Sequence, residues 1–365
     1  MGADQPRGLW TTEQGGFVHS RRRIGRGRLA AAGAGALAAA MAIGGLAVGS
    51  AGAASSKSQP HERTLHVAYL SYAVQNSYDA PMLAAAEAQA KKDNVVLKVF
   101  DANNNPTTQY SQFQDAITSH QYQGIIVQPI FGTALMGLAK QAIKDGIQVA
   151  NLDQTMGPNL STDQPQVKGL AVNVVFVDGE IGTKLGELVV KACANLHPCR
   201  VGYLYDIKIS ALDGELHKAF MAAIAGHKNV RVVATGQDYY SPALGLKAVQ
   251  NMLTAQPNLN LIVGTDQGLE GGLQALSSAG KLGKVILVGY GASAAAIKAI
   301  KTPADNWYGD VAQLPASEGR LAVEDLAWAI RTGILSGGVD PVAELPDAGV
   351  VTKANVNLFT PEWPG

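Results

Sequence analysis

Most of the side chains that could do chemistry are amides, carboxylates and aromatic rings that directly follow short apolar runs. In the first half of the chain they are Asn76, Tyr78, Asp79, Gln128, Asp153 and Gln154, and in the second half Asp206, Tyr239, Tyr240, Thr265, Asp266 and Tyr290. Amide and carboxylate side chains make paired hydrogen bonds to vicinal hydroxyls, and aromatic faces cover C–H patches. The set therefore indicates a binding site for a hydroxyl-rich small molecule, although carboxylates at strand ends also cap helices, a role that stays open for Asp266.

Motifs that would indicate catalysis are weak. Residues 289–294, Gly-Tyr-Gly-Ala-Ser-Ala, match a dinucleotide-binding fingerprint, but they lie near the end of the chain instead of in its first strand–helix unit. His61 and His66 are five residues apart, whereas a zinc-protease helix places its histidines four apart. We therefore expect no catalytic residues, no cofactor and no metal site.

The elements that must position these side chains alternate between strand and helix along the chain. Short apolar runs predict strands at 65–70, 95–100, 124–127, 148–152, 201–205, 230–235, 261–263, 285–289 and 308–311. Helical patterns between them cover 78–92, 107–120, 133–144, 180–194, 212–226, 242–255, 269–279, 293–301 and 315–332. Such alternation is typical of parallel sheets covered by helices.

These units are too many for one ordinary sheet, so the sequence predicts two doubly wound α/β lobes joined by a crossover hinge. The expected first lobe consists of 64–172 plus 313–342, and the expected second lobe of 173–312 plus 343–365. In open α/β sheets, ligands bind at the carboxyl ends of the strands, which is where the polar residues named above lie.

The N-terminal region has the composition of a targeting segment. The first 53 residues hold six arginines against two acidic residues, and an uncharged Ala/Gly-rich run from Leu29 to Val48 ends near Ala51-Gly-Ala53. A basic stretch, an apolar stretch and small residues, in that order, predict a signal peptide over 1–53, with a twin-arginine or a general secretion route open. A membrane anchor is the alternative. Residues 54–63 read as a flexible lead-in, and the mature protein is expected to be exported.

An exported location bears on the oxidation state of the two cysteines. Cys193 and Cys199 are separated by five residues at a predicted helix-to-strand corner. An oxidising compartment favours a local disulfide between them, and His197 supplies only a third potential ligand for a metal site that needs four. The charge balance of 29 basic and 29 acidic residues argues against a general nucleic-acid binder.

The chain resembles the ribose-binding-protein family of periplasmic sugar-binding proteins, which serve ABC transporters. The resemblance covers about residues 65–351, and it rests on the order of 76–78 (Asn-Ser-Tyr), 124–129 (Gly-Ile-Ile-Val-Gln-Pro), 146–153, 261–266, 288–290 and 311–315. It implies the type I periplasmic binding fold, with ligand held between the lobes.

The resemblance also implies ligand-binding roles for individual residues. Asn76 and Tyr78 match a polar and a stacking residue on the first loop, and Gln128 matches a polar residue after the third strand. The further matches are Asp153, an acceptor for sugar hydroxyls; Tyr240, a ring cover; Thr265, where the family has Asn; Asp266, which shapes the loop; and Gln313, at a lobe crossover.

Departures from the family pattern predict a ligand other than ribose. Gln154 and Gly214 stand where the family has arginines, and Tyr290-Gly291 stands where it has Phe-Asp. Losing two arginines removes planar bidentate donors to hydroxyls. Asp79, Asp213 and Tyr239 are candidates for replacement contacts, and the sequence does not name the sugar or polyol.

The function predicted from these features is solute binding for an ABC transporter. The expected partners are a sugar or polyol and membrane permease subunits, with no nucleic acid, and the expected state is a monomer at the periplasmic or extracellular side of the cytoplasmic membrane. The alternatives are a sensor protein that presents a sugar to a receptor, a regulator with a lactose-repressor-like core, and an enzyme of the cell envelope.

Overall fold

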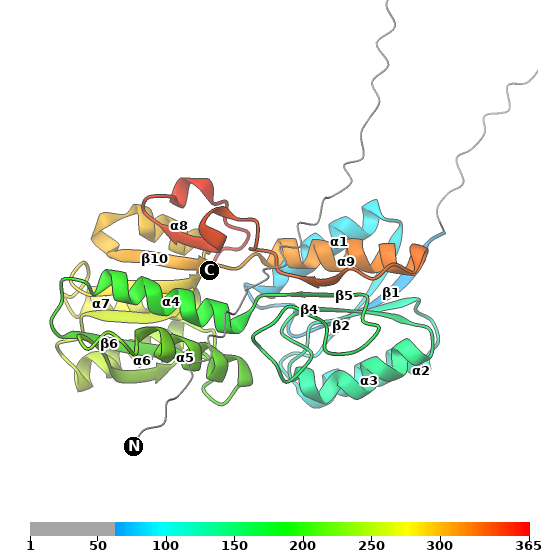
Figure 1. Ribbon diagram of the computed structural model, residues 1–365, viewed down its shortest axis with the longest axis horizontal. Helices are drawn as coiled ribbons and strands as arrows, with labels where there is room; N and C mark the ends of the chain where they lie inside the picture. The colour runs from blue at the N-terminus through cyan, green and yellow to red at the C-terminus, as the bar shows by residue number, and fades with distance from the viewer. Residues whose placement is uncertain (1–62) are drawn as a thin grey trace, which may run out of the picture. The chain divides into compact units, whose positions relative to one another are not determined.

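The computed structural model describes residues 63–365 (Figure 1). The predicted signal peptide, 1–53, and residues 54–62 of the predicted lead-in lie outside the described residues. Within 63–365 the strands form two six-stranded sheets, each covered by helices, so the predicted two-lobe α/β architecture is confirmed. None of the helices in this part of the chain is long and apolar enough to cross a membrane.

The sheet of the first lobe is parallel throughout. Its order is β11 (Gly337–Val339), β5 (Val172–Val175), β4 (Gln148–Asp153), β3 (Gly124–Val127), β1 (Leu65–Ser71) and β2 (Val95–Asp101). Successive side chains of a strand point to opposite faces, and here both faces are apolar. Val67 and Ile126 therefore belong to one buried cluster, whereas Ala68 and Ile125 belong to another on the opposite face.

Two helices cover each face of this sheet (Figure 1). They are α1 (Asp79–Lys92) and α9 (Pro315–Thr332) on one face, and α2 (Pro106–Thr118) and α3 (Gly132–Lys144) on the other. The α1–α9 pair packs closely because Gly319 has no side chain: a Cβ there would lie 2.0 Å from the carbonyl oxygen of Met82. Asn105 caps α2 by accepting hydrogen bonds from the backbone N–H groups of Thr107 and Thr108.

The sheet of the second lobe repeats this strand order. It runs β12 (Val350–Thr352), β10 (Trp307–Ala312), β9 (Ile286–Gly291), β8 (Leu261–Thr265), β6 (Cys199–Tyr205) and β7 (Val230–Gln237). All neighbours are parallel except β12, which is antiparallel to β10.

The helices of the second lobe pack in pairs on one another and on the sheet. α4 (Asp178–Ala192) packs against α5 (Ala211–Ile224), and α6 (Pro242–Ala255) packs against α7 (Asp266–Ser278), which also contacts α8 (Ala294–Lys301). Short 3₁₀ turns lie at Pro303–Asp305, Pro346–Gly349 and Val356–Leu358. The disulfide expected between Cys193 and Cys199 is present, and it joins the end of α4 to the start of β6.

The chain passes between the lobes three times. It leaves the first sheet after β5, returns after β10 to form α9, and leaves again after β11. The predicted boundary between 172 and 173 is therefore wrong by a few residues, because Val172–Val175 is a strand of the first sheet, paired with β4. The strands β5, β11 and β12 have three or four residues each and gave no recognisable alternation in the sequence.

Candidate ligand-binding site

A cavity of about 510 Å³ lies at the carboxyl ends of the strands and is lined by residues of both lobes. The first lobe contributes Tyr72, Asn76, Tyr78, Asp79, Asn104, Pro106, Gln128, Ile130, Phe131, Asp153 and Gln154. The second lobe and the connections contribute Asp178, Ile181, Ile207, Ile209, Ser210, Leu212, Leu216, Tyr239, Tyr240, Thr265, Gln267, Tyr290, Gln313 and Trp363. Amides, carboxylates and aromatic rings from distant parts of the sequence thus meet around one space.

Gln128, just past β3, organises the polar side chains of the first lobe. Its Nε2 donates hydrogen bonds to Oδ1 of Asp79 at 2.6 Å and to Oδ2 of Asp153 at 3.0 Å. Its Oε1 accepts from the backbone N–H of Tyr72 at 3.0 Å. The buried amide therefore holds two carboxylates in place and fixes the loop that carries Tyr72.

Both carboxylates are hard to ionise. Burial raises the pKa of Asp153 to about 6, against the opposing effect of the Gln128 hydrogen bond. Burial also raises the pKa of Asp79 well above its usual range, and the neighbouring charge of Asp153 adds to this rise. Burial in a low-dielectric site disfavours the charged form, and a second carboxylate disfavours it further.

Tyr78 joins the first lobe to the C-terminal segment. Its ring meets Trp363 edge to face, with centroids 5.3 Å apart, and its hydroxyl donates to Oε2 of the buried Glu318 on α9 at 3.0 Å. Oδ1 of Asn76 accepts from the backbone N–H of Tyr78 at 2.7 Å. Asn76 therefore shapes the loop before α1 while it also lines the cavity.

In the second lobe, the polar centre is the buried Asp206 at the end of β6. The Thr265 hydroxyl donates to Oδ1 of Asp206 at 2.7 Å, and the Tyr290 hydroxyl donates to Oδ2. Asp238, beside Asp206, has its pKa raised to about 7 by burial. The Thr265 hydroxyl also accepts from the backbone N–H of Gly268 and so caps α7.

Three residues that line the cavity have strained backbone conformations. Asp153, Tyr239 and Tyr240 have φ values of 65°, 54° and 56°, in the left-handed region that favours glycine. Such conformations are costly for bulky residues and persist where the surrounding structure enforces them, commonly at functional sites. The strained loops after β4 and β7 present these three side chains to the cavity.

Most of the predicted site residues meet at the cavity. They are Asn76, Tyr78, Asp79, Gln128, Asp153, Gln154, Tyr240, Thr265 and Gln313, and Tyr239 also lines it. Lining the cavity does not by itself establish contact with a ligand, so their binding roles remain predictions.

Asp213 and Asp266 lie outside the cavity lining, and their ligand-binding roles stay predictions. Asp213 accepts from the backbone N–H groups of Asp206 at 3.1 Å and Ile207 at 2.8 Å, so it braces the turn between β6 and α5. Asp266 accepts from the backbone N–H of Ser293 at 2.7 Å. Asp213 is thus occupied by its own turn, and Asp266 holds the residue that precedes α8, so both carboxylates have structural roles.

Several lining residues escaped the sequence reasoning. Tyr72 lies directly after β1 and before the predicted residues Asn76 and Tyr78, yet no pattern distinguishes it from its neighbours. Gln267 donates to the Ser77 hydroxyl at 3.1 Å, a contact between the lobes. Asp178 and Trp363 come from the start of α4 and the C-terminal segment, far in sequence from any predicted site residue.

The glycines of the dinucleotide-like stretch are explained by packing. A Cβ at Gly291 would lie 2.5 Å from the Trp363 ring, and one at Gly289 would lie 2.4 Å from the Asp310 carboxylate. The indole N–H of Trp363 donates to the carbonyl oxygen of Gly291 at 2.9 Å. These glycines make room for buried neighbours beside the cavity.

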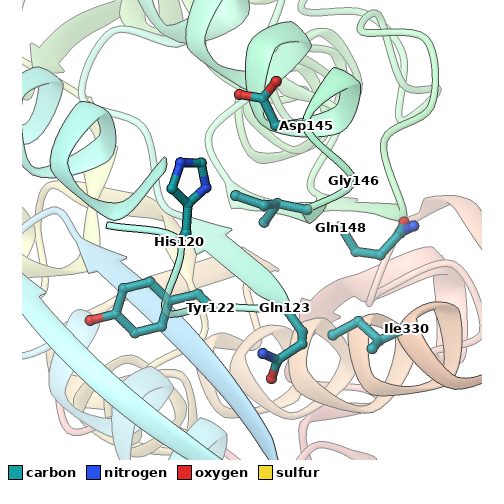
Figure 2. A pocket seen from close by; sticks show the side chains of 8 residues that line it. His120, Tyr122, Gln123, Asp145, Gly146, Gln148 and Ile330 are labelled. Atoms are coloured by element: carbon teal, nitrogen blue, oxygen red, sulfur yellow. The ribbon is translucent and has the colours of Figure 1, made fainter. Parts of the chain in front are cut away.

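A second, smaller hollow lies on the first lobe. It measures about 270 Å³ and is lined by residues that include His120, Tyr122, Asp145 and Gln148, at the amino ends of β3 and β4 (Figure 2). This edge is opposite to the one where open α/β sheets bind ligands. In residues 63–365, no group of three or more His, Cys, Asp or Glu residues is placed to hold a metal ion.

Comparison with known proteins defines the class to which this fold and site belong. The family model described as "periplasmic binding protein domain" matches residues 67–333, most of the chain. The chain therefore belongs to the periplasmic binding protein family. Members of this family are binding proteins, and the curated relatives named for a compartment are periplasmic.

The relatives include proteins named for pentoses. The ribose import binding protein of Salmonella typhimurium is 27% identical over 251 residues, covering 68% of this chain and 79% of the relative. The D-xylose-binding periplasmic protein of Escherichia coli is 27% identical, with 74% and 78% covered. A solved ABC transporter solute-binding protein from Mycobacterium smegmatis, with bound glycerol, has a TM-score of 0.69 at 22% identity, covering 83% of this chain and all of the other. This last likeness shows the shared two-lobe fold.

Proposed function

We propose that this protein is the exported solute-binding component of an ABC importer and that it binds a sugar or sugar-like polyol between its lobes. The observation that carries the proposal is the 510 Å³ cavity at the carboxyl ends of both sheets, lined by amide, carboxylate and aromatic side chains from both lobes. Hydroxyl groups pair with the polar side chains, and the rings cover the C–H faces of a sugar.

The named ligands of the relatives support this ligand class. Relatives are named for ribose, xylose and allose, and one structural neighbour holds myo-inositol. The replacement of family arginines by Gln154 and Gly214, and the Tyr290-Gly291 pair, make ribose itself a poor fit. We therefore expect a different pentose, a hexose or a polyol.

The mechanism follows from the division of the site between two lobes. A ligand that contacts Asp153 in the first lobe and Tyr240 in the second favours the arrangement of the lobes in which both contacts form. The liganded protein then docks on the permease subunits and releases its ligand chemically unchanged. We infer that the protein acts as a monomer outside the cytoplasmic membrane and does not bind nucleic acid.

The decisive test is ligand binding by the mature chain, prepared from residue 54 onward and freed of bound molecules by unfolding and refolding. Thermal shift and isothermal titration calorimetry against a panel of pentoses, hexoses and cyclitols should reveal binding by at least one of them. Tyr240→Ala should weaken that binding at least tenfold, whereas the exposed Tyr308→Ala should not. Absence of binding to the whole panel, or conversion of a bound compound to a product, would contradict the proposal.

A further inference from the structure

The charges around the cavity all have one sign. Asp79 and Asp153 line it from the first lobe and Asp178 from the second, whereas no Lys, Arg or His of the described residues lines it. Two lysines of the second lobe are engaged elsewhere: Lys208 lies over the Tyr205 ring, and Lys184 pairs with the exposed Glu180. A neutral sugar would not need three buried carboxylates without a cation.

Of the three carboxylates, Asp178 gives the strongest evidence, because its side chain has no hydrogen-bond donor among the described residues. The residue is 6% exposed, it lines the cavity, and its side chain makes no hydrogen bond to any of residues 63–365. It is the first residue of α4, where the helix dipole favours a negative charge but supplies no specific donor. A buried acceptor without a donor is costly, so this carboxylate is built for a group that enters the cavity.

Other titratable groups around these carboxylates make the field more negative. The other carboxylates whose charges act on Asp79 or Asp178, or on the tyrosines beside them, are Glu87, Asp101, Asp206, Asp213, Glu215 and Glu318, whereas Tyr69, Tyr72, Tyr78 and Tyr240 stay neutral because burial raises the pKa of each. Burial first, and then the charge of Asp153, raises the pKa of Asp178 well above its usual range. The buried Glu318 behind Tyr78 leaves its Oε1 without a partner, which adds to the unbalanced charge.

The aromatic rings of the cavity suit the same kind of ligand. Seven of them line it: Tyr72, Tyr78, Phe131, Tyr239, Tyr240, Tyr290 and Trp363. Ring faces attract cations as well as sugar C–H groups, and this attraction is stronger where water is excluded. Since the described residues provide no cluster able to ligate a metal ion, the cation must be part of an organic molecule.

We propose that the natural ligand is a polyhydroxylated compound carrying a protonated amino group, an amino sugar or an aminocyclitol, whose ammonium group faces Asp178 and the Asp79–Asp153 pair. This inference rests on the proposed function and narrows its ligand class. An ammonium group has three donors and no acceptor. It therefore matches a cavity that is lined by carboxylate acceptors and by no Lys, Arg or His of the described residues. Gln154 stands where the family has an arginine. No guanidinium group therefore occupies the place that the ammonium group of such a ligand would take.

The test compares ligands that differ only in the charged group. Each set contains a parent, its amino derivative and, for the sugars, the neutral N-acetyl form: D-glucose, D-glucosamine and N-acetyl-D-glucosamine; D-galactose with its two counterparts; and scyllo-inositol with scyllo-inosamine. Affinities are measured at pH 7 by titration calorimetry on the refolded mature chain. We expect the amino member of at least one set to bind at least tenfold more tightly than its neutral counterparts.

Two variants of α4 test whether the Asp178 carboxylate causes the preference for the amino ligand. Asp178→Asn keeps the shape and removes the charge, so the ratio of amino to neutral affinity should fall at least tenfold. Glu187→Gln removes an exposed carboxylate of the same helix and should leave the ratio unchanged. Thermal unfolding without ligand shows that each variant is folded. Titration in two buffers of different ionisation enthalpy should reveal proton release with the amino ligand, because a bound cation favours ionised carboxylates.

The outcomes separate this inference from the proposed function. If neutral members bind as tightly as the amino members, if the Asp178→Asn ratio is unchanged, or if no proton is released, the inference is wrong while the solute-binding function stands. If no sugar, amino sugar or cyclitol of either kind binds, the proposed function and the inference both fail.

Discussion

The side-chain amide of Gln128 lies 2.6 Å from Oδ1 of Asp79, a buried hydrogen bond between the end of β3 and the first residue of α1. The same nitrogen donates to Asp153 at 3.0 Å. One uncharged side chain therefore donates hydrogen bonds to both first-lobe carboxylates of the cavity, so its removal has consequences for both.

Gln128→Leu should lower the free energy of unfolding by about 1–3 kcal/mol, because two buried carboxylates lose their donor. The exposed Gln114→Leu on α2 is the matched control and should change it by less than about 0.5 kcal/mol. Urea denaturation at pH 7 without ligand measures both values. Equal stability of the two variants would show that the amide does not support the acidic pair.

The ligand-free protein should lose stability as the pH rises from about 5 to about 8. Burial raises the pKa of Asp153 and Asp266 to about 6 and that of Asp238 to about 7, so at intermediate pH the folded state binds protons that the unfolded state has released. Stability therefore falls as the pH rises through these values. His217, whose pKa is lowered by burial, acts in the opposite direction but is one partly exposed group.

Thermal unfolding across this range should show a melting temperature several degrees lower at pH 8 than at pH 5. Asp178→Asn should reduce the difference, because it removes one buried ionisable group. A melting temperature that stays level or rises with pH would mean that the folded protein already stabilises the ionised form of these carboxylates without ligand.

Two glycines provide a matched test of helix packing. Gly319→Ala should destabilise the protein by about 1–3 kcal/mol, since the new methyl group would meet the carbonyl of Met82 in the α1–α9 contact. Gly214→Ala lies within α5 with nothing within 4 Å of the new Cβ, so it should stabilise the protein by up to about 1 kcal/mol. Urea denaturation of both variants measures the difference. Effects of the same sign would argue against the close α1–α9 approach.

Reduction of the Cys193–Cys199 disulfide should lower the free energy of unfolding by about 2 kcal/mol, the value expected for a short closed loop. Ligand affinity should change little, because β6 starts at Cys199 and reaches the cavity end about 20 Å away. Denaturation and ligand titration with and without a reductant test both parts. A large loss of affinity on reduction would show that strain at this corner reaches the cavity.

The sequence predicted the sheets well because buried parallel strands leave clear apolar runs such as Ile125–Val127. It also predicted Asp153 and Gln128, since a strand end marks the binding edge. The sequence could not decide the role of Asp213, because a carboxylate beside a strand end can equally brace its own turn. Trp363 and Asp178 were missed because their place at the cavity depends on long-range packing, which local pattern does not encode.

The first lobe is built from two separated pieces of chain, and this has a consequence for synthesis. Its sheet face containing Ile126, Leu152 and Val174 is covered by α9, which follows nearly all of the second lobe in sequence. While the ribosome makes β6 to β10, only α1 covers that face, and the part that α9 will cover stays exposed. A nascent or exported chain thus needs a holding chaperone until α9 emerges, and fragments that end before residue 315 should aggregate.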